Sequence, residues 1–593
     1  MKRLTLDVNH LDAKTRRPNT PPGSPRRFWI ALGLIVLLAL GLRLLPLAVQ
    51  PPWMDEVAST IFSLGNSSRS VPINRLVDLH TFLQPLQGSG RLAPGAVIQH
   101  LLSEDNHPPL YFLLAHGWLR LVQPEAGLAS IGLSRLLPAL LGVAAVPLSA
   151  AVGGVALQSR RGALLAAAWM AISPLALAQS LEIRQYSLAI LLSTGSLLCL
   201  VKAWRLHQAG KILPIGWLLG WIAVNGAGVA SHYFFVLGVL MQGAAIALLL
   251  RRNRRCWLAL LGSLAMAALW LPVLAGFAGS GQSSWLRMDP SQPAALLAMV
   301  LQGLLGVLFA AVAPGTYAVH PWQWPFAVAA GLATLAGVAL LGAGLRFTLL
   351  RRGQRPEDLQ QECQPGQITA INLAGMEATA MLAVLVACGL AVQIAISLAL
   401  LSDFTKGFRY SFFLIPTVVA LLAALCEAQL ASSSPLRRRR SIALLACGLV
   451  CALGVDAGAV LPKWYAGNLL AERIAHDSSL PIVLAYDHNP VGTAPTVIGH
   501  EPLSLAWWIG RHPERFKDQA GNAQSPRFVM AADGPGLPGA RRQESLAAIA
   551  QIREPIDLWV IGGNPQTFVN PSCQLIQQGS EGSHLFIHYR CRG

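Results

Sequence analysis

Charged residues are scarce in this sequence. Asp, Glu, Lys and Arg together make up 12% of the 593 residues, whereas hydrophobic residues make up 53%. A soluble protein of ordinary composition carries about twice that share of charge. The balance therefore excludes a chain that folds entirely in water, and it predicts a polytopic membrane protein.

Acidic residues are the scarcer charged kind, with 28 Asp and Glu against 45 Lys and Arg. A surplus of positive charge can indicate nucleic-acid binding. Here, however, the basic residues form short clusters between apolar runs, such as Arg160-Arg161 and Arg437 to Arg440. The positive-inside rule places such clusters on the cytoplasmic side of a membrane. We therefore interpret the charge as topology and expect no nucleic-acid partner.

Several signatures of cofactor and metal binding are missing. The nine cysteines include no CxxC pair and no metal-type Cys/His spacing. The sequence has no Walker A loop, no convincing GxGxxG after a strand and no solenoid repeat, so ATP is not indicated as an energy source. Cys573 and Cys591 are placed to form a disulfide, which requires an oxidising compartment. The cysteines that fall inside apolar runs, where we expect them to pack, are Cys199, Cys388, Cys426, Cys447 and Cys451.

Long apolar runs are what the sequence has in abundance. The first, 28–49, follows a polar, basic and Pro-rich stretch over 1–26 that predicts a disordered cytoplasmic tail. The run is long enough to cross a bilayer, and no signal-peptide cleavage site follows it. Because arginines precede it, we expect the N-terminus inside and the adjacent carboxylates Asp55 and Glu56 outside.

The segment 50–106 contains no apolar run of spanning length, so we expect a large external loop with an amphipathic helix over 73–86. The next run, 108–122, is short for a crossing. If it crossed, Arg160-Arg161 would lie outside; if it lies in the membrane plane, these arginines fall inside, and we prefer this alternative. The same argument places an in-plane or re-entrant segment at 294–320.

With those two in-plane segments, the sequence predicts about eleven crossings in a membrane domain over 27–461. A charged cytoplasmic loop ends at about residue 375, and the connection from Ser402 to Tyr410 is external. After the first crossing, the predicted spans are 131–157, 162–180, 185–202, 213–231, 233–250, 256–277, 323–349, 376–401, 410–430 and 441–461.

The composition changes at about residue 462. Over 462–593, short apolar blocks alternate with segments of helical pattern, so we predict a small external α/β domain. The predicted strands are 481–486, 527–530, 558–561 and 584–587, and the predicted helices are 503–509 and 544–552.

The predicted topology gathers most of the unusual polar residues near spans on one face of the membrane. A polar cavity there, with a base and several cations, suits a reaction on a lipid-linked anionic substrate. A carboxylate can deprotonate an attacking hydroxyl, and guanidinium groups can hold a phosphate leaving group. Structural alternatives are a solvated helix end for the acidic pair, a local salt bridge, and snorkelling anchors. The residues gathered in this way are Asp55, Glu56, His107, Glu182, Arg184, Tyr186, His232, Lys406 and Arg409.

The order of these motifs resembles the GT-C glycosyltransferases. The motifs are a first span followed by Asp-Glu, His-Pro-Pro-Leu-Tyr from His107, Glu-x-Arg-x-Tyr from Glu182, and a late Arg409-Tyr410 with a downstream Pro. They are most similar to the branch of protein mannosyltransferases and lipid A aminoarabinose transferases. The resemblance covers about residues 28–461. It implies a polyprenyl-phosphate-sugar donor, transfer with inversion at the external face, and in-plane helices in the external loops.

By position, the resemblance implies that Asp55 is the catalytic base, with Glu56 beside it. It implies no metal ion or other cofactor, because metal-dependent relatives use several scattered acidic residues and this sequence has one convincing acidic pair. A divalent metal is not excluded by the resemblance. The protein mannosyltransferases' internal lumenal domain is missing, and no motif identifies the acceptor, which can be a lipid, a protein or a glycan. The implied substrate-binding residues are His107, Tyr111, Glu182, Arg184, Tyr186, Lys406, Arg409 and Tyr410.

We therefore expect a multi-pass inner-membrane glycosyltransferase, a hexosyl- or pentosyltransferase, with a cytoplasmic N-terminus and a periplasmic or extracellular C-terminal domain. The alternative is a multi-span transporter or lipid flippase, which would use inverted repeats, broken helices and charges near mid-membrane. The charges here gather at one face and no repeat is visible, which favours the enzyme. A catalytically inactive scaffold stays open as a third alternative.

Overall fold

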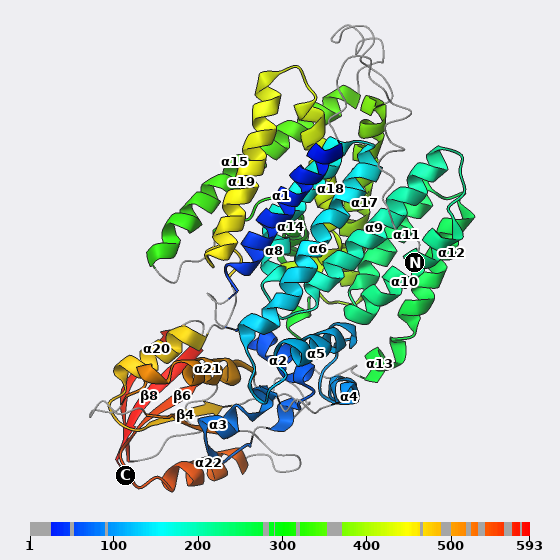
Figure 1. Ribbon diagram of the computed structural model, residues 1–593. Helices are drawn as coiled ribbons and strands as arrows, with labels where there is room; N and C mark the ends of the chain where they lie inside the picture. The colour runs from blue at the N-terminus through cyan, green and yellow to red at the C-terminus, as the bar shows by residue number, and fades with distance from the viewer. Residues whose placement is uncertain are drawn as a thin grey trace.

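The computed structural model shows a helical bundle and a second part built on a β-sheet, here called the sheet unit (Figure 1). The predicted tail lies, up to residue 24, outside the described residues, as does most of the predicted loop before residue 375. The described residues are 25–47, 52–70, 72–88, 93–276, 284–289, 291–315, 321–352, 371–462, 467–487, 500–517, 524–531, 540–562, 572–581 and 584–592.

Among the described residues, six helices of the bundle are long and apolar enough to cross a membrane, or seven if one bent pair is a single span. Five more apolar helices have 10–17 residues. The multi-helix membrane architecture is thus present, whereas the count of about eleven crossings is not confirmed. The bundle contains α1 (Pro25–Leu44), α6 (Ile131–Leu157), α7 (Arg160–Ile172), α8 (Pro174–Ser180), α9 (Tyr186–Gln208), α10 (Ile215–Ser231), α11 (Phe235–Leu249), α12 (Arg254–Ala268), α13 (Leu271–Gly276), α14 (Pro293–Leu308), α15 (Trp324–Arg352), α17 (Ile371–Ala399), α18 (Ile415–Leu430) and α19 (Pro435–Asp456).

One predicted span, 162–180, is broken into two helices. α7 and α8 meet at an angle of 56°. The break falls at Ser173-Pro174 because proline has no N–H to continue the helical hydrogen bonds and disfavours the helical conformation of the preceding residue. The Ser173 side chain accepts a hydrogen bond from Ala176 N and caps α8. The break directs the chain into the turn after α8, which carries Arg184.

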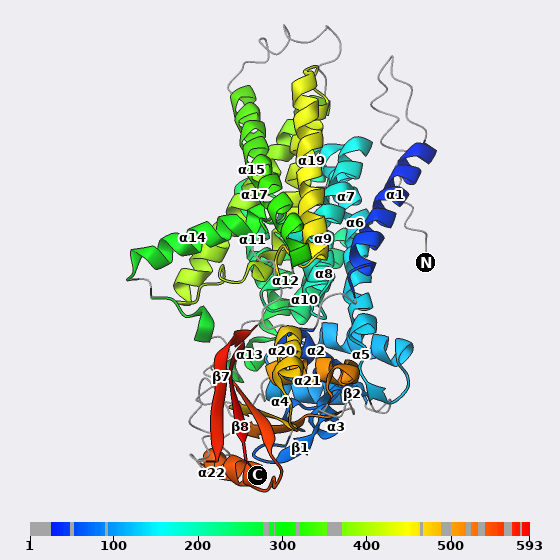
Figure 2. The same cartoon turned by 90° about the vertical axis from the view of Figure 1, so that its left-hand side faces the viewer.

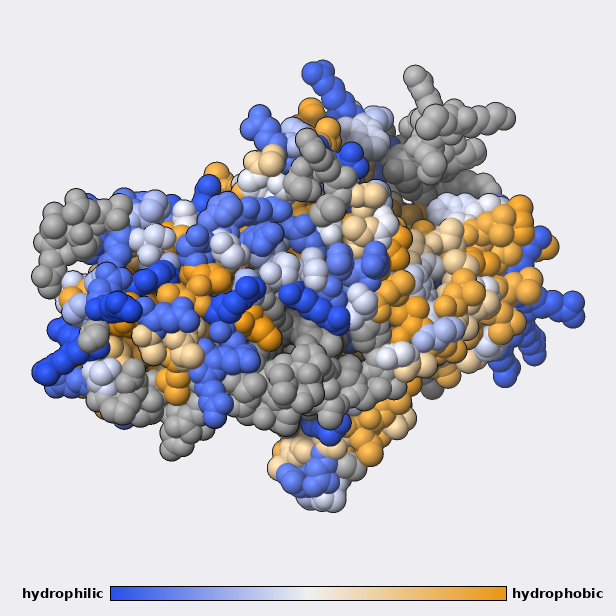
Figure 3. All heavy atoms as spheres, turned by 90° about the horizontal axis from the view of Figure 1, so that it is seen from below, coloured by the Kyte–Doolittle hydropathy of each residue, from blue (hydrophilic) through white to orange (hydrophobic). Residues whose placement is uncertain are grey.

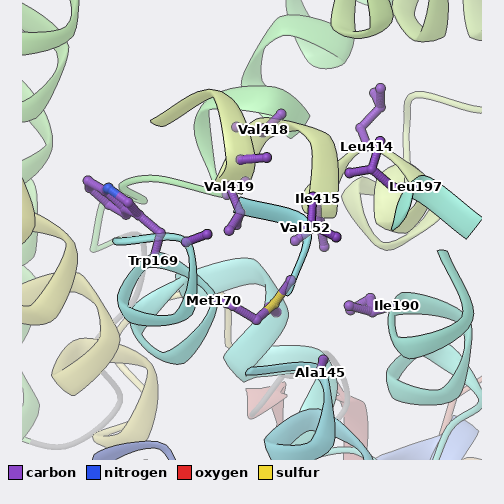
Figure 4. Close-up of a cluster of buried hydrophobic side chains, with 14 of the residues drawn as sticks. Ala145, Val152, Trp169, Met170, Ile190, Leu197, Leu414, Ile415, Val418 and Val419 are labelled. Carbon is purple, nitrogen blue, oxygen red and sulfur yellow. The ribbon is translucent and has the colours of Figure 1, made fainter. Parts of the chain in front are cut away.

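Apolar side chains fill the core of the bundle. Side chains of α6, α7, α9 and α18, including Val152, Trp169, Ile190 and Val418, lie close together there (Figure 4). Small residues let neighbouring helices approach closely, as they do in membrane proteins generally. At Gly153, for example, an added Cβ would lie 2.6 Å from the Gly162 carbonyl oxygen across the α6–α7 contact.

The two regions that were predicted to lie in the membrane plane form short helices that do not run along the long direction of the bundle. α5 (Leu110–Val122) has 13 residues, about 20 Å of helix, which is too short for a hydrocarbon layer of about 30 Å. It lies beneath the bundle with α2 (Met54–Leu64) and α4 (Pro94–Glu104) (Figures 1 and 2). α14 runs sideways out of the bundle (Figure 2). Its exposed apolar side chains are Leu297, Val300, Leu301, Leu304 and Leu305.

The sheet unit contains a six-stranded sheet in the order β1-β5-β4-β6-β8-β7. The strands β5, β4 and β6 are parallel, and the outer strands are antiparallel to their neighbours. Apolar side chains of α20 and α21 cover one face and those of α22 the other. The elements are β1 (Leu76–Asp78), α20 (Gly467–Asp477), β4 (Ile482–Asp487), α21 (His500–Arg511), β5 (Arg527–Ala531), α22 (Ala540–Ala550), β6 (Ile556–Ile561), β7 (Cys573–Glu581) and β8 (His584–Cys591).

All four predicted strands and both predicted helices of this unit are present, but the amphipathic helix predicted over 73–86 is wrong. That segment forms β1, the short helix α3 (Leu79–Phe82) and a 3₁₀ turn, Gln84–Leu86. Leu76 packs on one face of the sheet and Val77 on the other. Side chains of a strand alternate between the two faces of a sheet, so a strand can bury both residues. The segment forms a strand because β5 supplies the backbone hydrogen-bonding partner.

The predicted disulfide between Cys573 and Cys591 is present and joins β7 to β8. Of the cysteines expected to pack in apolar runs, Cys447 is partly buried and the others are buried. Viewed from below, hydrophilic atoms gather on one side of the molecule and hydrophobic atoms on the sides of the bundle (Figure 3). The surface therefore changes character between the sheet unit and the bundle.

Candidate functional site

The start of α2 separates the two neighbouring carboxylates. Asp55 and Glu56 both lie in its first turn, where the positive end of the helix dipole favours negative side chains. Successive residues of a helix point about 100° apart. The Glu56 side chain is fully buried, whereas that of Asp55 is 19% exposed.

Glu56 binds into the protein interior. Its two oxygens accept hydrogen bonds from Arg135 Nε at 2.7 Å and Arg135 Nη2 at 2.8 Å. One of them also accepts from Ile183 N at 3.1 Å. Arg135 in turn donates to the Leu47 carbonyl at 2.8 Å. Glu56 thus ties α2 to α6 and to the turn that carries Arg184.

Asp55 lies between two guanidinium groups. Arg409 Nη1 donates to Asp55 Oδ2 at 3.1 Å, and Arg184 Nη2 lies 3.7 Å from the same oxygen. The guanidinium carbon of Arg409 lies 5.2 Å from the Trp53 ring centre and 5.9 Å from that of Trp285. The two guanidinium groups beside Asp55 can also donate hydrogen bonds to an anionic ligand.

Arg184 is buried and bridges several partners. Nη1 donates to Ser59 Oγ at 3.1 Å, and Nη2 lies 3.0 Å from His107 Nε2. The other nitrogen of the imidazole, Nδ1, lies 2.7 Å from Asp105 Oδ1. Burial opposes ionisation of Asp105, but the hydrogen bond from His107 and the charge of Arg184 outweigh it, so the pKa of Asp105 lies below its ordinary value. Polar contacts therefore connect Asp105 to Asp55 through His107 and Arg184.

The structure brings the other predicted residues to the same region to different degrees. Tyr186 is buried and lies 5.2 Å, ring centre to ring centre, from His232. Glu182 exerts an electrostatic effect on Arg409. Tyr410 lies beneath the guanidinium of Arg409, at 5.4 Å.

Two predicted residues have distinct surroundings. Tyr111 is fully buried in α5, and its hydroxyl has no hydrogen-bond partner among the described residues. Lys406 is exposed and donates to the carbonyls of Trp285 and Arg287 at 3.2 and 3.1 Å. It thereby holds the 284–287 segment, which carries Trp285, next to Arg409.

Sequence reasoning missed several residues of this region. Arg135 lies inside a predicted span, and an arginine within an apolar run is a signal that could have identified it. Asp105 stands two positions before His107, close enough to suggest a pair. Ser59 and Trp285 carry no signal of their own in the sequence, because their role follows from the folded arrangement.

The described part of the chain contains no group of three or more His, Cys, Asp or Glu side chains that could hold a metal ion. The charged groups at Asp55 alternate in sign instead. The arrangement can bind an anion through Arg184 and Arg409 and can accept a proton on Asp55.

The fold and site define a class: a polytopic membrane protein with a carboxylate between two guanidinium groups at the end of its bundle. No family model matches the chain, and no curated protein matches it. Among solved structures, apo ArnT from Cupriavidus metallidurans is similar, with 15% identity, 95% of this chain and 98% of that chain covered, and a TM-score of 0.40. ArnT bound to undecaprenyl phosphate gives 14% identity, 94% and 98% coverage, and a TM-score of 0.37.

The oligosaccharyltransferase AglB from Archaeoglobus fulgidus, in complex with an inhibitory peptide and a dolichol-phosphate, is also similar. Its identity is 13%, the covered shares are 90% of this chain and 69% of that chain, and the TM-score is 0.41.

Proposed function

We propose that this protein is a glycosyltransferase that moves a hexose or pentose from a polyprenyl-phosphate donor to a hydroxyl of a lipid, protein or glycan. The observation that carries the proposal is the position of Asp55 between Arg409 and Arg184. One group that can accept a proton and two that can hold a phosphate are what such a transfer requires.

The proposed reaction is a single displacement. The acceptor oxygen attacks the anomeric carbon of the sugar, and its proton passes to Asp55. The bond from the anomeric carbon to the phosphate oxygen breaks, and the electron pair leaves with the polyprenyl phosphate. Arg409 and Arg184 hold that phosphate and stabilise the charge that grows on it. Attack opposite the leaving group inverts the anomeric configuration.

Other residues support this geometry. Glu56, which the motif resemblance places beside the base, is proposed to position α2 through Arg135. Lys406 is proposed to act through the 284–287 segment. Tyr111 offers a buried hydroxyl for a substrate group. No metal ion takes part in the proposed steps. The remaining substrate-binding residues of the proposal are His107, Glu182, Tyr186 and Tyr410.

We further propose a multi-pass inner-membrane topology of about eleven crossings, with a cytoplasmic N-terminus and the site on the external face. The arginine clusters support this orientation through the positive-inside rule. The disulfide of the sheet unit supports an oxidising compartment on the side of the site.

The proposal is tested with purified protein, undecaprenyl phosphate as the binding probe, and a panel of undecaprenyl-phosphate sugars for turnover. We expect Asp55→Asn to bind undecaprenyl phosphate while losing turnover about 100-fold or more. We expect Arg409→Ala to lose binding. Arg473→Ala, which removes an exposed guanidinium of the sheet unit, is the matched control and should behave like the parent.

A transporter or flippase is the second candidate, and the break between α7 and α8 is the observation that favours it. The same experiment separates the two functions. Binding without turnover of any donor, combined with movement of a labelled lipid across a proteoliposome membrane, would support transport. Absence of binding, or variants that match the parent, would remove the proposed site.

A further inference from the structure

The segment between α4 and α5 contains a carboxylate, Asp105, that has no role in the proposed reaction and lies beside the imidazole of His107. Asp105 Oδ1 lies 2.7 Å from His107 Nδ1, and His107 Nε2 lies 3.0 Å from Arg184 Nη2. We propose that Asp105 is a positioning residue, which sets the tautomer of His107 so that the imidazole keeps Arg184 at 3.7 Å from Asp55. The inference rests on the proposed function for its effect on transfer, but its structural part does not depend on any substrate.

The chemistry of the partners fixes the tautomer. A guanidinium group only donates hydrogen bonds, so His107 Nε2 must present a lone pair to Arg184. The ring proton then resides on Nδ1, which donates to the carboxylate of Asp105. The opposite tautomer would place two N–H groups against each other at Arg184 and two acceptors against each other at Asp105. Asp105 therefore selects the form of His107 that can accept.

The local backbone holds this pair in place. Asp105 follows the last residue of α4, and its Oδ1 also accepts from Asn106 N at 2.6 Å. The side chains of Asp105 and His107 are 14% and 23% exposed. The His107 ring lies 6.0 Å from that of Phe112 in α5. Two prolines follow His107 directly, and they restrict the backbone into α5.

The consequence concerns how strongly Arg184 binds Asp55. Arg184 divides its donors among His107, Ser59 and Asp55, and its distance to Asp55 is 3.7 Å, against 3.1 Å for Arg409. Without the acceptor at His107, Arg184 would move onto Asp55. A carboxylate held by two close guanidinium groups is a weaker base, so loss of Asp105 should slow proton transfer more than it weakens donor binding.

The kinetic test compares Asp105→Ala, which removes the acceptor, with Asp105→Asn, which keeps an acceptor oxygen. We expect Asp105→Ala to lower kcat about tenfold or more while KM for an undecaprenyl-phosphate sugar changes less than about threefold. We expect Asp105→Asn to retain much of the activity. Asp78→Asn is the matched control, because it makes the same charge change at a residue that caps α3 through Thr81.

A double-mutant cycle shows whether Asp105 acts through His107. In a His107→Gln background, the further change Asp105→Ala should alter kcat less than about twofold. Equal, independent losses in the two backgrounds would overturn the inference. A uniform loss of folded protein, with kcat unchanged in the folded fraction, would do the same.

The tautomer itself is measured on ¹⁵N-histidine-labelled full-length protein in nanodiscs at neutral pH. The His107 resonances are those lost in His107→Gln. We expect a protonated Nδ1 and an unprotonated Nε2 in the parent, and a mixture of tautomers in Asp105→Ala. A protonated Nε2 in the parent, or no change in Asp105→Ala, would overturn the inference. This spectrum decides it even if no donor sugar is turned over, in which case the proposed function alone fails.

Discussion

The effect of substituting a charged residue in this site depends on how its charge is compensated. Asp55 and Glu56 are adjacent in the chain, but Glu56 is fully buried against Arg135 and Asp55 faces two arginines near the surface. A buried charge that loses its partner is costly, whereas a buried pair replaced as a whole is often neutral. The two carboxylates should therefore respond differently to substitution.

We predict that Arg135→Met lowers the free energy of unfolding by about 3–5 kcal/mol, because it leaves Glu56 buried without its charged partner. The double variant Glu56→Gln/Arg135→Met should recover a large part of that loss. Thermal unfolding in detergent, followed by tryptophan fluorescence, measures both. As a control, Arg473→Met breaks the half-exposed pair with Asp477 and should change stability by less than about 1 kcal/mol. Additive losses in the double variant would contradict this account of Glu56.

A second prediction concerns Asp557 at the start of β6, whose pKa lies at about 2. Burial raises this pKa, but hydrogen bonds from His588, Ser479 N, Leu480 N and Arg590 outweigh it. Because the pKa in the folded state lies below the ordinary value of 3.8, the contribution to stability is complete above about pH 4 and is lost as the pH falls toward about 2. It is on the order of 2 kcal/mol.

Acid titration of the sheet unit, followed by Trp559 fluorescence and circular dichroism, tests this prediction. Asp557→Asn should be less stable than the parent at neutral pH. Between about pH 4 and pH 2, the difference in stability between the two proteins should shrink. A constant difference across that range would show that Asp557 does not stabilise the unit through its charge.

The site residues that could be predicted from the sequence are those whose residue type is unusual at their position. Asp55, His107, Arg184 and Arg409 were all found from polar residues beside apolar runs, and the structure brings them within a connected set of contacts. Partners such as Ser59 could not be predicted, because a serine in a helix has many possible environments. Their role depends on contacts between segments far apart in sequence.

Among the elements, the break between α7 and α8 leaves backbone groups that need partners inside the bundle. Pro174 has no N–H for Met170 O, and Leu175 N donates to Phe309 O instead of Ala171 O. The buried side chain of Arg43 in α1 donates hydrogen bonds to both carbonyl groups: Nη2 to Met170 O at 3.3 Å and Nη1 to Ala171 O at 3.1 Å. α1 thus stabilises the bend that leads to Arg184.

We predict that Arg43→Met lowers the free energy of unfolding by several kcal/mol, since an unsatisfied backbone group costs about that much in an apolar environment. Adding Pro174→Ala should restore part of the loss, because alanine supplies an N–H that can reach Met170 O. Thermal unfolding of the single and double variants measures this, with Pro174→Ala alone as the control. A double variant no more stable than Arg43→Met would contradict the proposed capping role.

Element prediction from the sequence worked where an element is buried by its own periodic pattern. The run 131–157 coincides with α6, and the four predicted strands of the sheet unit are present. The errors have non-local causes. The segment 73–86 has a helix-like apolar spacing, but β1 pairs with β5 from the other end of the chain. The break of 162–180 begins at Pro174, but Arg43, which binds the freed carbonyls, lies in another helix.

In the whole molecule, the sheet unit is attached to the helix that carries Asp55. Ser504 in α21 donates a hydrogen bond to the Pro52 carbonyl, just before α2. Trp507 Nε1 donates to the Ala129 carbonyl at 3.2 Å, just before α6. Together with the pairing of β1 and β5, these contacts join the two ends of the chain around the site.

We predict that this attachment stays closed during turnover. Asp78 and Arg527 are directly opposite each other in the β1–β5 pair, at a separation that a disulfide can bridge. Oxidation of Asp78→Cys/Arg527→Cys should therefore form a cross-link and leave turnover unchanged. The reduced double variant and each single cysteine variant under oxidant are the controls. Loss of turnover on oxidation, reversed by reductant, would instead show that the sheet unit moves away in each cycle.

The pairing of β1 with β5 also sets the order of events during synthesis. The strand that ends at Asp78 has to wait for its partner beginning at Arg527, which is 449 residues later (527 − 78). At about 5–20 residues per second, the ribosome needs roughly 20–90 s to make that stretch. Throughout this interval β1 has been synthesised but its partner strand β5 has not. A chaperone that protects this chain would therefore have to act on its earliest loop until nearly the last residues have been translated.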